Sequence, residues 1–419
     1  MQRLLVAGLH LPGSGLTNVL TALVAELRGT FAIRCLGFAP SARAGDEDGS
    51  ILGCTARLRN VRGRAFSASP EWLELELTRH PPDTVLVIAP AYVAAPLLRQ
   101  LQPWRGRSRI VLYLPIEGSL ANDELAPILE LADTCVTYTE GARADVAALF
   151  ARNPCRAAPQ LAVVGHGTDP SRFFPIAAPD ERSRRIAARR SIYSERLDDA
   201  FVVLNSNRPY LRKRLDLTIA AFGLFARDKP DAHLHLHTGE RSPEQARELA
   251  GAIARTGVAD RIHLTPRRRD APVRSTRWLN TLYNACDVGL TTAMGEGWGL
   301  GLFEHAATRA ALIAPAHTGF SENWQDAALL VPAPGREHIF YEAANMSVVS
   351  PDDVAGALEL LYRDRMLLTR MAAAAFARAR EARYTWGEVG KQFAHILTRD
   401  DVPPTREAHV VASSAMADL

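Results

Sequence analysis

The chain has 419 residues, more than one ordinary hydrophobic core accommodates, so two domains are expected. Hydrophobic residues make up 47% and charged residues 23% of the chain, a composition that fits a folded protein and excludes a disordered or fibrous one. The formal net charge of +3 is small for this length, which argues against nucleic acid as the main partner.

Nothing in the sequence predicts export or insertion into a membrane. No run of about twenty apolar residues occurs, and the N-terminal MQRLLVAGLHLPG lacks the parts of a signal peptide. The cysteines are scattered without paired zinc spacing, as expected for buried free thiols in a reducing compartment. A cytoplasmic protein is therefore predicted. A peripheral membrane contact through Leu97–Arg109 is the alternative to plain solvent exposure of that stretch, which we favour.

The first half of the chain alternates short apolar, β-branched runs with amphipathic segments such as Leu16–Leu27 and Trp72–Arg79. Strands that alternate with helices indicate a parallel sheet covered on both faces. The predicted strands are Leu4–Leu9, Phe31–Phe38, Thr84–Ala89, Ile110–Leu114, Cys135–Thr139 and Ala162–Gly165.

The loop GLHLPGSG follows the first predicted strand and opens the first helix. Gly13, Ser14 and Gly15 can receive an anionic group there, because a helix start offers unpaired amides. The loop is not GxGxxG, and no acidic residue follows at the required place on the second strand. A nicotinamide-dependent dehydrogenase is therefore the least favoured of the enzyme classes considered.

Residues 177–199 break the alternation with Pro179 and the charged stretch ERSRRIAARR, which we interpret as an interdomain connection. We expect its arginines to form a solvated helix face rather than to bind an anion. A second alternating set then begins, and tandem parallel-sheet domains leave a ligand-binding cleft at the carboxyl ends of their strands. Its predicted strands are Phe201–Asn205, His233–His237, Arg261–Thr265, Val288–Thr292, Ala311–Ala314 and Leu329–Val331.

Three histidines, His233, His235 and His237, alternate along one of these strands and so point to the same face. No carboxylate joins them in the strand. A buried or half-buried face is favoured over a metal site.

The segment GEGWGLGLFEHAATRAALIAPAHTGFSE carries the strongest chemical signal. Glu296 and Glu304 flank a glycine-rich turn that a helical run follows. Glycines let a backbone approach a ligand closely, and the helix start favours a phosphate. The alternative is a capped helix with no ligand. The candidate donor-binding residues of this turn are Gly297, Trp298, Gly299, Leu300 and Gly301.

Two cations, Arg208 and Lys213, lie in NSNRPYLRKRLDL, between a predicted strand and a helix. The planar fork of arginine and the point charge of lysine suit different oxygens of a diphosphate. Lysine is rare in this chain, occurring only at Lys213, Lys229 and Lys391, so its use in this loop favours function over a plain basic loop.

These two segments resemble the retaining GT-B glycosyltransferases that include bacterial mannosyl- and N-acetylglucosaminyltransferases. Glu296-Gly-Trp-Gly-Leu-Gly-Leu-Phe-Glu304 is similar to the EGFGLPxxE signature of that family. Arg208 and Lys213 match its paired cations. VVGHGTDPSRFFP resembles its interdomain segment, with His166 at a turn near the cleft, and RYTWGEVGKQFAHIL looks like its terminal helix. We count His166 among the candidate donor-binding residues.

The resemblance implies an α/β fold of two Rossmann-like domains that face each other across a cleft. It also implies that Glu304 holds the ribose of the nucleotide, that Glu296 holds sugar hydroxyls, and that Arg208 and Lys213 hold the diphosphate. The expected parts are residues 1–180 on the acceptor side, 181–382 for the nucleotide-sugar, 383–399 as a helix that returns to the first domain, and 400–419 as a disordered tail.

The chain departs from the family at two places. Where many members carry a donor-contacting histidine, this chain has YLPIEG with Glu117. The resemblance therefore does not indicate which hydroxyl of the sugar is contacted at this position. Gly301 stands where proline is common.

The function predicted is transfer of a hexose from a nucleotide-sugar, UDP- or GDP-linked, to a small-molecule, glycan or lipid-linked acceptor with retention of configuration. No cofactor or metal is expected, because fixed cations can stabilise the leaving diphosphate. A nucleotide-sugar epimerase and a non-catalytic sugar-nucleotide binding protein remain the alternatives.

Overall fold

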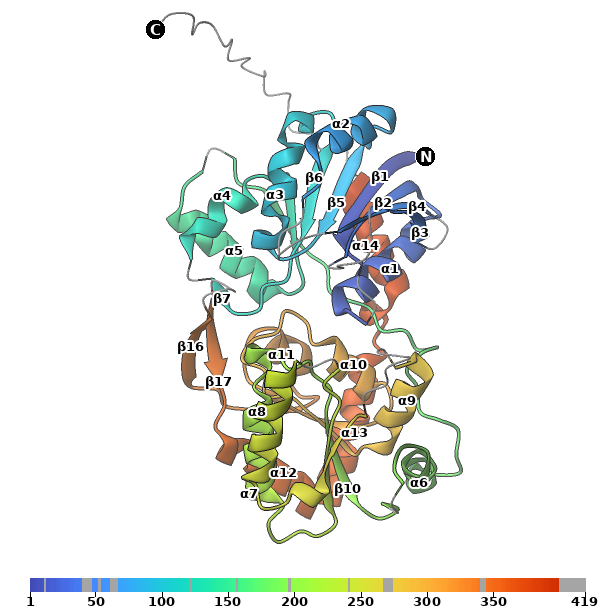
Figure 1. Cartoon of the computed structure of the whole chain (residues 1–419), viewed down its shortest axis with the longest axis vertical. Helices are drawn as coiled ribbons and strands as arrows, with labels where there is room; N and C mark the ends of the chain where they lie inside the picture. Colours follow the sequence, from blue (N-terminus) through green and yellow to red (C-terminus); the bar gives the residue numbers. More distant parts are fainter. Residues whose placement is uncertain are drawn as a thin grey trace, which may run out of the picture.

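The computed structural model describes residues 1–10, 13–39, 47–51, 54–60, 67–120, 122–155, 157–194, 197–239, 242–266, 274–339 and 344–398, and the predicted tail lies outside them. Figure 1 shows two α/β domains, one above the other. The first domain is built around an eight-stranded sheet and the second around a six-stranded one.

The first sheet has the strand order β3-β4-β2-β1-β5-β6-β8-β9 and is parallel except for β3, which runs antiparallel to β4. Strands β5 and β8 are buried along their whole length, as expected for a sheet with helices on both faces. The strands are β1 (Gln2–Leu9), β2 (Phe31–Ala39), β3 (Glu47–Ile51), β4 (Cys54–Asn60), β5 (Thr84–Ile88), β6 (Arg109–Tyr113), β8 (Thr134–Thr137) and β9 (Gln160–Val163), and the helices are α1 (Gly15–Leu27), α2 (Pro70–Arg79), α3 (Ala91–Leu101), α4 (Ala126–Leu129) and α5 (Glu140–Arg152).

Helix α3 corrects the interpretation of Leu97–Arg109 as a solvent-exposed stretch or a membrane contact. Leu97, Leu98 and Leu101 are buried in the first core, and Arg105 pairs with Asp133 at 2.8 Å. In the part of the chain that the structure describes, no helix is both long and apolar enough to cross a membrane.

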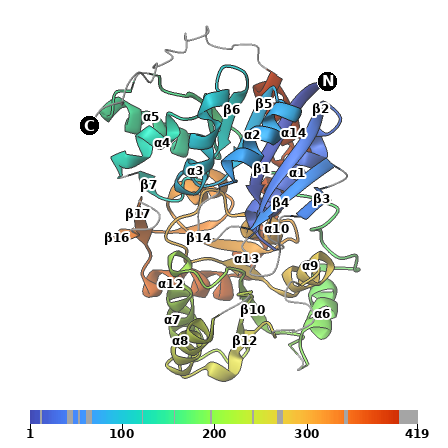
Figure 2. The ribbon, with the colours of Figure 1, turned by 45° about the horizontal axis from the view of Figure 1, so that its top comes forward.

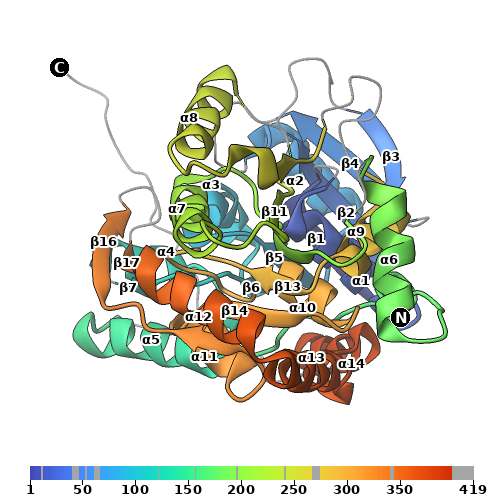
Figure 3. The same cartoon turned by 90° about the horizontal axis from the view of Figure 1, so that it is seen from below.

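The second sheet is fully parallel, in the order β12-β11-β10-β13-β14-β15. One face packs on α7 and α12 and the other on α9, α10 and α13, and Figure 3 shows helices on both sides of its strands. The strands are β10 (Phe201–Asn205), β11 (Ala232–Leu236), β12 (Ile262–Leu264), β13 (Val288–Leu290), β14 (Ala311–Pro315) and β15 (Leu329–Val331), and the helices are α6 (Glu181–Ile192), α7 (Leu215–Phe225), α8 (Pro243–Ala254), α9 (Thr276–Ala285), α10 (Leu300–Ala306), α11 (Thr318–Trp324), α12 (Pro351–Arg363), α13 (Arg365–Ala379) and α14 (Trp386–Thr398).

Helix α6 is only partly the solvated helix that we expected. Arg185 and Arg189 turn inward to Asp287 at 3.1 and 2.6 Å, and Arg189 also donates to the carbonyl of Ala285 at the end of α9. These bonds dock α6 onto the second domain. Its buried arginines are therefore structural.

The histidines of β11 also have structural partners. His233 lies within hydrogen-bonding distance of His263 on β12 at 3.0 Å, and His235 and His237 both contact the hydroxyl of Thr265. Among the residues the structure describes, no group of histidine, cysteine or acidic side chains is arranged to hold a metal ion.

The chain returns to the first domain at its carboxyl end, where α14 packs against α1 (Figure 2). Arg109 of β6 donates to the carbonyl of Ile396 at 2.6 Å. The two domains also share a small antiparallel sheet of β16 (Gly335–Ile339), β17 (Ala344–Val348) and β7 (Ser119–Leu120). A hairpin of the second domain therefore adds to a two-residue strand of the first.

Candidate active site

The glycine-rich turn lies at the carboxyl ends of β10 and β13. Gly299 has a φ of 89°, in the left-handed region where glycine is favoured, and it is the residue at which α10 begins. The turn closes one side of a pocket with about 330 Å³ of empty space. That pocket, called the turn pocket below, is lined by Leu204, Ser206, Asn207, Gly289, Leu290, Thr291, Glu296, Gly299, Gly301, Leu302, His305 and Phe320.

Glu296 is held by two cations. Its Oε2 accepts from Lys213 Nζ and from Arg212 Nη1, both at 2.5 Å. Burial disfavours the charged carboxylate, but Lys213 and Arg212 more than offset this and lower the pKa of Glu296 to about 2. Glu296 is therefore ionised at every working pH.

Lys213 is itself buried, with 6% of its surface exposed. It ends a short 3₁₀ helix at Leu211–Lys213, and the next residue, Arg214, adopts a left-handed conformation that starts α7. Burial and the neighbouring Arg212 lower the pKa of Lys213 below its usual value. The loop thus aims a desolvated ammonium group at the glycine-rich turn.

Glu304 lies one turn into α10 and accepts a hydrogen bond from the Tyr283 hydroxyl at 2.9 Å. The same hydroxyl is 3.3 Å from Ser206 Oγ, which lines the turn pocket. Burial raises the pKa of Glu304 to about 7, although Tyr283 and Arg172 oppose the shift. Glu304 can therefore change its protonation near neutral pH.

Arg208 reaches across the cleft to the first domain, where its Nη2 donates to the carbonyl of Gly13 at 2.5 Å. Ser14 is the N-cap of α1, and its side chain makes no capping bond. A Cβ at Gly15 would lie 3.5 Å from Leu300 of α10. The starts of α1 and α10 thus approach each other beside Arg208, an arrangement that favours an anion.

Glu117 enters the site from the first domain, where sequence reasoning placed it. It accepts from Arg212 Nη2 at 2.5 Å, and its backbone carbonyl presses on Gly295, at which a Cβ would clash at 1.7 Å. Burial raises the pKa of Glu117 above its usual value, and Arg212 opposes that shift.

Arg212 is the residue that sequence reasoning missed. We emphasised Lys213 because lysine is rare, whereas an arginine among so many carries little signal. The available hint was the run of three basic residues at 212–214 next to a buried strand.

Of the expected site residues, Glu296, Gly299 and Gly301 line the turn pocket, whereas Arg208, Lys213, Glu304, His166 and Trp298 do not. His166 and Trp298 differ from the other three because aromatic packing encloses them. The His166 ring is enclosed by aromatic side chains and lies 2.7 Å from the Tyr113 hydroxyl, and burial lowers its pKa to about 3. Trp298 stacks on Phe303 and lies against Gly165, where a Cβ would clash. Both residues pack the junction between the domains, which corrects their assignment to donor binding.

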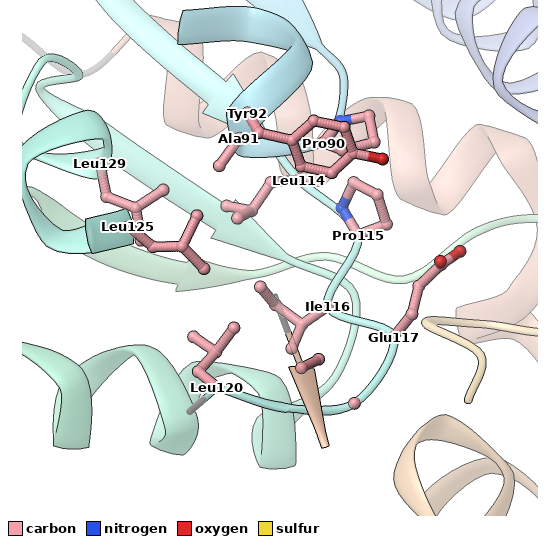
Figure 4. Close-up of a pocket in the computed structure, with 12 residues that line it drawn as sticks. Pro90, Ala91, Tyr92, Leu114, Pro115, Ile116, Glu117, Leu120, Leu125 and Leu129 are labelled. Carbon is pink, nitrogen blue, oxygen red and sulfur yellow. The ribbon is translucent and has the colours of Figure 1, made fainter. Parts of the chain in front are cut away.

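A second pocket lies in the first domain behind the loop that carries Glu117 (Figure 4). It has about 480 Å³ of empty space, and the Glu117 carboxylate points away from its apolar wall in this view. Its lining is Pro90, Ala91, Tyr92, Leu114, Pro115, Ile116, Glu117, Gly118, Leu120, Leu125, Leu129 and Ala344. No basic side chain contributes to this wall.

One part of the chain matches a known protein family. Residues 200–364 match the family described as glycosyl transferases group 1. No curated protein sequence matches the chain.

Solved structures match nearly the whole chain. It is similar to the sucrose-phosphate synthase of Thermosynechococcus elongatus, with 16% identity and a TM-score of 0.73 over 94% of this chain and 98% of that one. It is also similar to Anabaena HepE in complex with UDP and glucose, with 16% identity and a TM-score of 0.69 over 95% and 99%. The trehalose-6-phosphate protein of E. coli bound with UDP-2-fluoro glucose has 15% identity and a TM-score of 0.68 over 94% and 99%. The fold is therefore GT-B, as the sequence predicted.

Proposed function

We propose that this chain, of which residues 200–364 match the glycosyl transferases group 1 family, transfers a hexose from a UDP-linked donor to an acceptor hydroxyl with retention of anomeric configuration. The observation that carries the proposal is the convergence of Lys213 and Glu296 on the glycine-rich turn at the start of α10. The UDP-bound relatives of the same fold support the choice of nucleotide.

The roles follow from position and charge. Arg208 and Lys213 neutralise the donor diphosphate, together with the helix start at Gly13, Ser14 and Gly15. Glu304, beside Ser206 and Tyr283, accepts hydrogen bonds from the ribose.

The sugar lies between the two domains. Glu296 approaches it from the second domain and Glu117 from the first, and carboxylates at this place accept hydrogen bonds from sugar hydroxyls. The acceptor enters from the first domain, at the carboxyl ends of β5 and β6, where parallel sheets bind ligands.

In the transfer, the bond between the anomeric carbon and the diphosphate oxygen breaks, and the acceptor oxygen bonds to the same face of that carbon. The acceptor proton passes to an oxygen of the leaving diphosphate. Lys213 and Arg208 stabilise the charge that this group gains, a task that other enzymes give to a metal ion. Closure of the cleft keeps water from the donor.

The proposal is tested by incubating the purified chain with UDP-glucose in excess EDTA. We expect slow release of UDP and of α-glucose, with water as the acceptor, detected by proton NMR before the sugar mutarotates. Loss of turnover in EDTA that manganese or magnesium restores would contradict the role of the two cations. An epimerase instead yields a second nucleotide-sugar without added acceptor, and a binding protein yields no product. Parallel incubations with GDP-mannose and ADP-glucose test whether the chain prefers uracil as the base of the nucleotide-sugar.

The affinity for UDP-glucose is expected to rise about tenfold between about pH 6 and pH 8. The pKa of the Glu304 carboxyl in the free protein is about 7, and ribose hydroxyls bind its ionised form. Binding must therefore release a proton below this pKa and release none above it. Calorimetry in two buffers of different ionisation enthalpy measures that proton. The donor diphosphate has no ionisation in this range.

Glu304→Gln is the matched variant for this measurement. It should weaken binding at pH 8, abolish the pH dependence and leave turnover at saturating donor nearly unchanged, because a ribose contact is the same in ground and transition states. A pH dependence that survives in Glu304→Gln would assign the titration to another group.

A further inference from the structure

We propose that Arg212 is a positioning residue that keeps Glu117 and Glu296 together as a two-carboxylate site for the donor sugar when Lys213 turns to the diphosphate. The inference rests on the proposed function. It assigns a task to a residue that neither the family resemblance nor the fold identifies.

Arg212 joins loops of both domains through one guanidinium group. Nη1 donates to Glu296 Oε2 at 2.5 Å and to the carbonyl of Gly295 at 3.0 Å, while Nη2 donates to Glu117 Oε1 at 2.5 Å. The side chain of Arg212 is 13% exposed, and those of Glu117 and Glu296 are 19% and 18% exposed. The group therefore acts where water screens charges weakly.

The backbone of Arg212 is tied to the same place. Its carbonyl accepts from the amide of Met294 at 2.8 Å, which fixes the distance from this loop to Gly295 and Glu296. The guanidinium fork is therefore pre-aligned with two carboxylates from different domains. A lysine cannot do this, because its ammonium is a single point charge and not a planar fork.

Charge balance indicates when this matters. Glu117 and Glu296 bring two negative charges to a buried site, and Arg212 and Lys213 balance them. A nucleotide diphosphate attracts the ammonium group of Lys213. When Lys213 binds the phosphate, it neutralises the Glu296 carboxylate less. Arg212 is then the cation that still prevents the two carboxylates from repelling each other or taking up a proton.

Arg212 is not what holds the domains together. Ser119 and Leu120 follow Glu117 closely and pair with Asn345 and Ala344 of the second domain. Glu322 accepts from the amides of Glu140 and Gly141 at 2.9 and 3.0 Å, so a carboxylate of the second domain caps α5 of the first. Loss of Arg212 is therefore expected to disturb the sugar site and leave the domain contact in place.

The test compares Arg212→Met with the wild-type chain in UDP-glucose hydrolysis and in the binding of UDP and UDP-glucose. We expect turnover to fall at least about tenfold, with the affinity for UDP changed by less than about twofold, because UDP lacks the sugar that the two carboxylates contact. Arg378→Met is the matched control. Arg378 is a similarly enclosed arginine on α13 that bonds to Glu381 and to the carbonyl of Asn323.

A second variant separates positioning from a general loss of structure. If Arg212 acts by opposing repulsion between the carboxylates, Glu117→Gln should restore part of the turnover lost in Arg212→Met, since it removes one of the two charges. Independent effects of the two substitutions would overturn the proposal. Arg212→Lys should remain close to Arg212→Met.

The outcomes also separate this inference from the proposed function. If the wild-type chain binds neither UDP nor UDP-glucose, the proposed function fails and this inference fails with it. If the wild-type chain hydrolyses UDP-glucose and Arg212→Met does so equally well, only this inference is wrong. If Arg212→Met loses affinity for UDP as much as for UDP-glucose, Arg212 is a diphosphate ligand and not a positioning residue.

Discussion

Replacing Lys213 by methionine is expected to weaken the binding of UDP-glucose by roughly 10- to 100-fold, because a charge-assisted hydrogen bond worth roughly 1.5–3 kcal/mol is lost. Turnover should fall by a further factor on the order of 10², since the diphosphate gains charge as it leaves. Calorimetry and initial rates measure the two effects separately. Arg208→Ala is expected to weaken binding by a similar factor.

Lys229 offers a matched control for this prediction. It is the other buried lysine of the second domain, with 7% exposure, and it pairs with Asp228 and Glu359 instead of lying near the cleft. Lys229→Met should cost comparable stability and leave donor affinity unchanged. Unchanged donor affinity in both Lys213→Met and Arg208→Ala would overturn the diphosphate assignment.

The free energy of unfolding of Lys213→Met must be measured together with its donor affinity, because substitution of this buried lysine can destabilise the fold. Its removal leaves Glu296 with Arg212 as its partner, and breaking a buried ion pair costs up to about 3–5 kcal/mol. Methionine keeps the apolar stem of lysine and so limits the loss of packing.

Much of the sheet architecture was predictable because its buried strands are continuous apolar segments of the sequence. The runs at Phe201–Asn205 and Ala311–Pro315 are buried at every position, as strands covered on both faces must be. The hairpin of β3 and β4 was missed, since its residues are largely polar and its pairing is antiparallel. The strand β7 was also missed, because two residues are too few to show an alternation of polar and apolar side chains. They form a strand only by pairing with β17 of the other domain.

The site was predictable where a residue type is unusual in its context and was missed where it is common. The glutamates at the glycine-rich turn and the rare Lys213 were identified, and the structure brings Glu296 and Lys213 into contact. The task of Arg212 depends on a contact between residues 95 positions apart, which no local pattern encodes. His166 was chosen because VVGHGTDPSRFFP resembles the interdomain segment of the family, whereas the neighbouring Gly165 and Gly167 permit close packing of Trp298 and Trp386.

Glu296→Gln is expected to lower turnover on the order of 10²-fold and leave donor affinity unchanged or slightly tighter. The carboxylate is ionised, with its pKa at about 2. Under the proposed function it faces the place where positive charge develops at the anomeric carbon. Glutamine keeps the shape of the side chain and removes this charge. It also frees Lys213 from Glu296, which makes this cation more available to the diphosphate.

The measurement that decides this is donor affinity by calorimetry and turnover at saturating donor, determined separately for Glu296→Gln and Glu304→Gln. Glu337→Gln serves as the control, because Glu337 pairs with Arg214 at the edge of the small antiparallel sheet. If Glu304→Gln abolishes turnover with affinity intact while Glu296→Gln loses only affinity, the two roles are reversed. If neither variant changes either quantity, the glycine-rich turn is a capped helix without a ligand, since an ionised glutamate beside the developing charge cannot be neutralised without slowing the reaction.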